Sequence, residues 1–171
     1  KVKARSYDTL LFRHWDTWSD LRRRHIFLQP LAGGSPRDLT PGERDAVPSS
    51  STFSVGVDFD FSPDGSEIAC TATPLPTRTE AWSTNHDILI VPVAGGPPRQ
   101  LTTNPAADGA PRYSPDGKYL AYRAMSRPGF EADRWQLMLY DRKAMTSTSL
   151  TPSFDASVGT PVWSPDSRAL Y

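Results

Sequence analysis

The sequence has little cysteine, no net charge and no long apolar run, and each shortage excludes a class of protein. The single cysteine, Cys70, leaves no partner for an intrachain disulfide and no Cys-rich zinc site. Lys and Arg together number 19, as do Asp and Glu, so the formal net charge is 0. This balance disfavours a nucleic-acid partner and a polybasic membrane-surface protein. Because no apolar stretch approaches the ~18 residues of a spanning helix, we expect no membrane span.

Several motifs that carry chemistry are also missing. The three histidines form no H-E-x-x-H arrangement, the aspartates form no EF-hand loop, and the paired glycines belong to no phosphate-binding loop. No G-x-S-x-G nucleophile elbow occurs either. The sequence therefore predicts no metal ion and no cofactor, and offers no residue as nucleophile, general acid or general base.

Proline, by contrast, is abundant. The chain has 17 prolines and 11 glycines in 171 residues, and proline alone reaches roughly twice its average share. Helix interiors reject proline, so this composition favours a loop-rich all-β chain. The 18 aromatic residues are more than a disordered segment would carry.

An internal repeat is the main signal. An aromatic residue followed by Ser-Pro-Asp begins three similar segments, and their serines, Ser62, Ser114 and Ser164, are 52 and 50 residues apart. A second motif, G-G-x-P-R-x-L-T, occurs at residues 33–40 and 95–102, with a degenerate copy ending at Thr151. A period of about 50 residues fits four short strands with their connections, which is one blade of a β-propeller.

Each Ser-Pro-Asp segment predicts the tip of a β-hairpin. Proline presets the backbone for the second turn position, and the following glycine, Gly65 or Gly117, supplies a positive φ. The third copy has Ser167 at this position, where a left-handed conformation costs a non-glycine residue roughly 1 kcal/mol. Strand A precedes each tip and strand B follows it. Strand C is expected at His25 to Gln29, Asp87 to Val93 and Trp135 to Asp141, and strand D ends at Thr40, Thr102 and Thr151.

The fold class predicted is thus all-β, a partial β-propeller of four-stranded antiparallel blades. Residues 1–40 are expected to supply strands B to D of one blade, residues 41–102 and 103–151 two further blades, and residues 152–171 the start of another. So few blades cannot close a ring, which takes 4–8. We therefore expect the sequence to be a piece of a larger protein. A β-sandwich with accidentally similar turns is the alternative.

Three stretches resemble a known family. The runs FSPDGSEIAC, YSPDGKYLAY and WSPDSRALY are similar to repeats of TolB-like proteins and of the propellers of the prolyl oligopeptidase family. Residues 11–42 (LFRHWDTWSDLRRRHIFLQPLAGGSPRDLTPG) and 122–142 (YRAMSRPGFEADRWQLMLYDR) look like the acylaminoacyl-peptidase and dipeptidyl-peptidase V branch of that family. The resemblance implies a propeller followed by an α/β-hydrolase domain with a Ser-Asp-His triad, a domain that these 171 residues do not contain.

The resemblance implies that the chain gates and shapes the access of short peptides to that hydrolase domain, and that it is inactive alone. The expected partners are the hydrolase domain of the same protein and short peptide substrates. The alternative is a non-catalytic TolB-like or WD-type propeller that binds protein partners. The compartment stays open between the bacterial periplasm and the cytoplasm.

Candidate substrate-binding residues lie in the connections that are longer than a hairpin requires. Carboxylates there could hold the ammonium terminus of a peptide by charge-assisted hydrogen bonds, as propeller carboxylates do in some branches of the family. They could equally be solvated or paired with Arg134 or Arg127, and the tryptophans could line a channel or pack between blades. The candidates are Glu80, Glu131, Asp133, Arg134, Trp15, Trp18 and Trp82.

Overall fold

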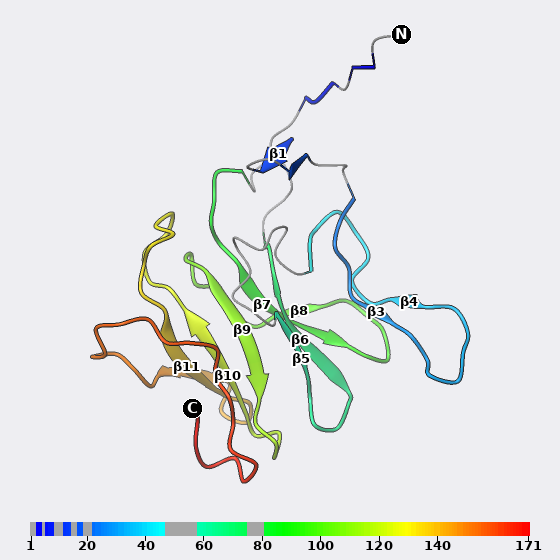
Figure 1. The fold of residues 1–171 in the computed structure, drawn as a ribbon. Helices are drawn as coiled ribbons and strands as arrows, with labels where there is room; N and C mark the ends of the chain where they lie inside the picture. Colours follow the sequence, from blue (N-terminus) through cyan, green and yellow to red (C-terminus); the bar gives the residue numbers. More distant parts are fainter. Residues whose placement is uncertain are drawn as a thin grey trace.

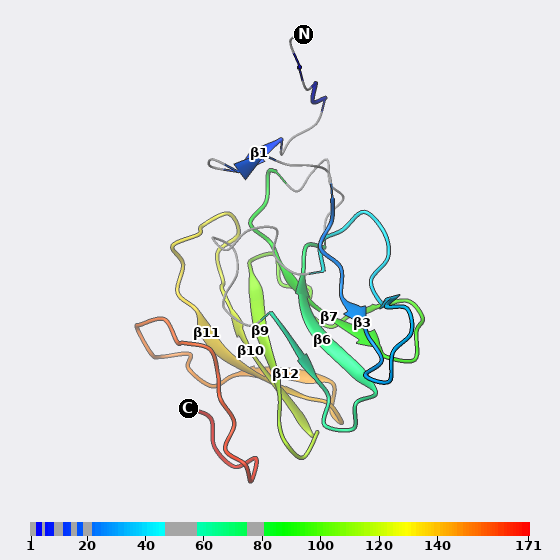
Figure 2. The ribbon, with the colours of Figure 1, turned by 45° about the vertical axis from the view of Figure 1, so that its right-hand side comes forward.

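The computed structural model describes residues 3–4, 6–8, 12–14, 17–18, 22–46, 58–74 and 81–171. Within them the chain is all-β, with twelve strands and no helix, and no segment is a helix long and apolar enough to cross a membrane. Two antiparallel sheets of four strands lie side by side, and two smaller two-stranded sheets accompany them (Figures 1 and 2).

The first large sheet contains β5 (Phe59–Phe61), β6 (Glu67–Ala72), β7 (Asp87–Pro92) and β8 (Arg99–Gln100), in that spatial order. The second contains β9 (Asp108–Tyr113), β10 (Tyr119–Ala124), β11 (Gln136–Asp141) and β12 (Thr146–Ser149), also in chain order. Both sheets are simple antiparallel meanders, as predicted for four-stranded blades. The period of about 50 residues and the division of the chain into blades remain predictions.

A pair of short strands, β3 (Phe27–Leu28) and β4 (Arg37–Asp38), repeats the geometry of the outer strands of both large sheets. In these three sheets a threonine Oγ1 accepts the backbone N–H of a residue next to the start of strand C (β3, β7 or β11), at 2.9 Å each time. The donors and acceptors are Ile26 with Thr40, Ile88 with Thr102, and Leu137 with Thr151. The L-T half of the second motif therefore fastens strand D to strand C.

The three Ser-Pro-Asp segments form the predicted turns. In each, the serine Oγ donates to the aspartate Oδ1 at 2.6–2.7 Å and accepts a backbone N–H five residues later. Gly65 and Gly117 have φ of 68° and 71°, and Ser167 takes the same left-handed conformation at 61°. Ser167, which stands where the other two copies have glycine, is thus a strained residue in an otherwise identical turn.

The core lies between the sheets, because β6 and β7 bury side chains on both faces. Ala69, Ile88 and Ile90 pack with Tyr113 and Leu120 of the second large sheet. On the opposite face, Ile68, Cys70 and Val91 pack with Leu39, and with Ile26 and Leu28 around β3. The nearly continuous apolar run of residues 87–93 is explained by this double coverage.

The turns and the long connections lie at opposite ends of the sheets. The turns at Pro63, Pro115 and Pro165 point to the bottom of both views, and residues 125–134 lie at the other end (Figures 1 and 2). We call these the turn end and the loop end. Strands β1 (Arg13–His14) and β2 (Thr17–Trp18) pair only with each other and lie beyond the loop end.

Candidate functional site at the loop end

The loop end gathers polar side chains because strands A and C begin there and strand B ends there. Asp58 and Asp108 lie at or just before the start of strand A, Asp87 begins strand C, and Arg123 is next to the last residue of strand B. All four are buried, with exposed fractions of 9% or less. Interior charges need partners, so this end of the sheets is held together by polar contacts rather than by apolar packing alone.

Asp87 and Asp108 form the most deeply buried acidic pair. Gln100 Nε2 donates to Asp87 Oδ2 at 2.8 Å, and Asn104 Nδ2 donates to Asp108 Oδ1 at 2.9 Å. Asp108 Oδ2 is buried with no hydrogen-bond partner in the described part of the chain. Desolvation raises the pKa of Asp87 to about 6 and that of Asp108 to about 7. Both side chains are only 1% exposed, so they shape the interior and do not meet a ligand.

Residues 125–134 form a compact loop around one carboxylate. Asp133 Oδ2 accepts the backbone N–H groups of Ser126 and Arg127, both at 2.8 Å, and Asp133 Oδ1 pairs with Arg127 Nε at 3.1 Å. These bonds, with that from the Ser126 backbone the largest, hold the pKa of Asp133 well below its usual value. The guanidinium of Arg127 in turn lies 4.0 Å from the ring centre of Phe130. Asp133 therefore fixes the shape of the loop.

The neighbouring candidates in this loop have different surroundings. Arg134 donates from Nη1 to the carbonyl oxygens of Thr151, at 3.0 Å, and Phe154, which joins the loop to the following link. Glu131 is exposed at the loop surface. The loop thus brings Glu131, Asp133 and Arg134 together, and among these three only Glu131 presents an exposed carboxylate.

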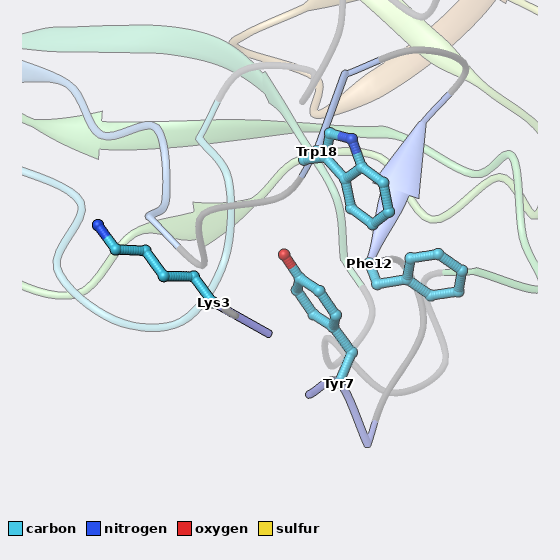
Figure 3. A pocket seen from close by; sticks show the side chains of 4 residues that line it. All are labelled: Lys3, Tyr7, Phe12 and Trp18. Carbon is cyan, nitrogen blue, oxygen red and sulfur yellow. The ribbon is translucent and has the colours of Figure 1, made fainter. Parts of the chain in front are cut away.

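The tryptophan candidates lie elsewhere. Trp82 is 70% exposed in the connection before β7. Trp18 packs with Tyr7 and Phe12, with ring centres 6.1 Å away in both cases, and these three side chains with Lys3 line a pocket of about 600 Å³ (Figure 3). Glu80 and Trp15 lie outside the described residues.

Some residues of the loop end were not found from the sequence. Phe130 stands beside the predicted Glu131 under the guanidinium of Arg127, and a cation stacked on a ring three residues away in a loop has no periodic signal. Tyr7 and Phe12 meet Trp18 across a segment without a recognisable strand pattern. Among the described residues, no group of His, Cys, Asp and Glu side chains could hold a metal ion.

Stacked antiparallel sheets with turns at one end and long loops at the other define a portion of a β-propeller. Two solved TolB proteins share this fold, and each covers 85% of the chain. The one from Agrobacterium tumefaciens has a TM-score of 0.62 at 25% identity over 45% of its own length, and the one from Acinetobacter baumannii has 0.60 at 16% over 31%.

Among curated proteins, relatives named dipeptidyl-peptidase 5 match the chain. The protein of Porphyromonas gingivalis is 31% identical over all of this chain and 25% of its own length. The protein of Aspergillus fumigatus is 27% identical over 98% of this chain and 26% of its own length. The chain therefore spans about a quarter of the length of these relatives. They confirm the resemblance to a propeller portion of a peptidase of the dipeptidyl-peptidase V branch, although no family model matches the chain.

Proposed function

We propose that the chain is the propeller portion of a serine exopeptidase, of the dipeptidyl or acylaminoacyl type, and that it controls which peptides reach a separate hydrolase domain. The observation that carries this proposal is the match of the whole chain to dipeptidyl-peptidase 5 relatives that are about four times longer. A rigid propeller above a catalytic domain admits short peptides and excludes folded proteins and bulk water.

The loop end is proposed to face the hydrolase domain and the substrate. Its connections exceed what a hairpin needs, whereas the three Ser-Pro-Asp turns at the turn end are tight and satisfy their own polar groups. Loops of this kind, positioned by rigid strands, are where proteins commonly place binding residues. Trp18 and Trp82 supply exposed aromatic surface at or beyond this end. Glu80 and Trp15 stay candidates from the sequence alone.

Glu131 is proposed to hold the ammonium terminus of a peptide. Asp133 is engaged by the backbone of its own loop and by Arg127, so it positions the loop and leaves Glu131 as the exposed carboxylate. Arg134 joins the same loop to residues 151–154, which limits its movement. A fixed loop lowers the conformational entropy lost on binding.

The test is Glu131→Gln in the full-length protein, assayed with a free-amine dipeptide substrate and its N-acylated counterpart. Losing a charge-assisted hydrogen bond is expected to lower kcat/KM for the free-amine substrate about tenfold, and the value for the acylated substrate is expected to stay unchanged. Glu67→Gln is the matched control, because Glu67 lies at the turn end, paired with Arg142. An unchanged ratio between the two substrates removes Glu131 from the binding site.

A second candidate function is a non-catalytic propeller that binds protein partners, which the likeness to the TolB structures favours. The complete reading frame of the gene distinguishes the two functions. A G-x-S-x-G elbow with downstream Asp and His supports the peptidase, and further repeats without such an elbow support the scaffold.

A further inference from the structure

The N-terminal residues form a pocket to which the loop of Glu131 does not contribute. Among the described residues, the pocket is lined by Lys3, Tyr7, Phe12 and Trp18, and its volume is about 600 Å³ (Figure 3). Pockets of about 300–1,000 Å³ are the size that takes small ligands. The pocket is therefore large enough to be a binding site in its own right.

Three aromatic rings form one wall of this pocket. The ring centres of Tyr7 and Phe12 are 5.7 Å apart, and that of Trp18 is 6.1 Å from each of them. The ring planes of every pair are within 37° of parallel. Phe12 and Trp18 remain 37% and 56% exposed, so the wall keeps apolar surface that a ligand can cover. A flat apolar group gains both from leaving water and from stacking on such a wall.

The borders of the pocket are positively charged. Lys3 forms the side opposite Phe12 (Figure 3). Arg13 is paired with Trp18 in the register of β1 and β2, and its guanidinium lies 5.8 Å from the centre of the Trp18 ring. Residues 1–18 contain four Lys or Arg against two Asp, in a chain whose formal net charge is 0. The local charge therefore attracts an anion.

This charge decides between two kinds of ligand that aromatic walls suit. Aromatic rings alone favour quaternary ammonium ions and other cations. Here Lys3 and Arg13 already bring two positive charges to the rings, and a cationic ligand would be repelled by both. A carboxylate can instead accept a charge-assisted hydrogen bond from the Lys3 ammonium, whose flexible four-carbon stem lets it turn toward the ligand.

We propose that this pocket binds a ligand that joins one flat apolar group to one carboxylate. The apolar group lies against the rings of Tyr7, Phe12 and Trp18, and the carboxylate pairs with Lys3. Two sources share this chemistry, a free arylalkanoic acid and the carboxyl-terminal residue of a short peptide. The site does not rest on the proposed peptidase function, because neither Glu131 nor a hydrolase domain takes part in it.

The experiment follows the fluorine NMR signal of Trp18 in the full-length protein labelled with fluorotryptophan. The loss of one signal in Trp18→Phe identifies it. Phenylpropanoate and acetyl-Ala-Ala-Phe probe the two sources, and the corresponding amides are their neutral counterparts. Both carboxylates are expected to shift the Trp18 signal saturably and to bind about three- to tenfold more tightly than the amides. The signal of the exposed Trp82, assigned from Trp82→Phe, is the control and is expected not to move.

Substitutions of Lys3 test the charge separately from the apolar wall. Lys3→Gln is expected to bring the affinities of the carboxylate and the amide probes together, and Lys3→Arg is expected to keep the preference for the carboxylate. Lys143→Gln, at an exposed lysine between β11 and β12, is the matched control and is expected to leave the preference unchanged. Lys3 is itself exposed, so these substitutions do not disturb a packed core.

The proposal is overturned by equal affinities of the carboxylate and amide probes for the wild type, by a preference that survives Lys3→Gln, or by equal shifts of the Trp82 signal. No saturable shift at about 10 mM probe overturns it as well. A Trp18 signal that responds to vesicles of anionic phospholipid and not to the acids assigns these residues to a membrane surface instead. None of these results bears on the test of Glu131, so the two proposals fail separately.

Discussion

At the scale of single residues, the buried Asp108 gives the chain a specific dependence on pH. Its pKa is raised from 3.8 to about 7 by desolvation, despite donors from Asn104 and Thr102, and the neighbouring charge of Asp87 raises it further. The folded state therefore binds this proton more tightly than the unfolded state does. The resulting stabilisation is complete below pH 3.8 and is lost as the pH rises toward 7.

Asp108→Asn is expected to remove the loss of stability that wild type shows as the pH rises, since the amide keeps the shape of the side chain and cannot ionise. Relative to wild type, the variant gains stability between pH 5 and pH 8, by at most about 3 kcal/mol. Urea unfolding at several pH values measures the difference, with Asp155→Asn, at an exposed carboxylate, as the control variant. A difference between Asp108→Asn and wild type that is the same at pH 5 and pH 8 would contradict the burial argument.

Gly65 tests the backbone of the Ser-Pro-Asp turns without any change in packing. Its φ is 68°, and a Cβ placed there would meet nothing within 4 Å. Gly65→Ala is therefore expected to cost about 1 kcal/mol through conformation alone. Gly159 has equally open surroundings and no positive φ, so Gly159→Ala is expected to be neutral or slightly stabilising. Equal effects of the two substitutions in thermal unfolding would show that the turn is not strained in this way.

At the scale of elements, the threonine that joins strands C and D is the smallest repeated unit of sheet stability. Thr102 Oγ1 accepts the buried N–H of Ile88, and the residue is 7% exposed. Thr102→Val leaves that N–H without its acceptor and is expected to cost about 1–3 kcal/mol. The exposed Thr103→Val is the matched control and is expected to change stability by less than about 0.5 kcal/mol in chemical unfolding. Equal costs of the two substitutions would show that the hydrogen bond from Ile88 N–H to Thr102 does not stabilise the sheet.

The strands and turns were predictable because their signals are local and recur. Proline, aspartate and glycine fix the turn at residues 63–65 almost alone, and the apolar run 87–93 has the length of a strand covered on both faces. The N-terminal region gave no such signal: β1 and β2 have two residues each, and the pocket of Tyr7, Phe12 and Trp18 depends on contacts between irregular segments.

The candidate site was less predictable than the fold, since a carboxylate in a loop fits several roles. The sequence placed Asp133 among the ligand-binding candidates and also allowed an ion pair with Arg127. The structure shows that pair, together with two backbone bonds that no pattern in the sequence indicates. Only three-dimensional contacts separate Asp133, which shapes the loop, from the exposed Glu131.

At the scale of the whole molecule, the sheets are held in sequence by contacts that cross from one to the next. Arg142 Nη2 of the second large sheet pairs with Glu67 Oε1 of the first at 2.5 Å, and Tyr113 OH donates to the same oxygen at 2.9 Å. Arg37 donates from Nη1 to the carbonyl oxygen of Ala94 at 2.8 Å, which joins the sheet of β3 and β4 to the first large sheet. These contacts stack successive sheets face to face, as the blades of a propeller require.

The most direct test of the central claim is an experimental structure of the full-length protein. We predict that residues 59–100 and 108–149 are consecutive blades around one axis, with residues 82–86 and 125–134 toward a hydrolase domain and the turns at Pro63 and Pro115 away from it. A structure in which the two sheets enclose a self-contained barrel, or in which the turn end faces the catalytic domain, would contradict it.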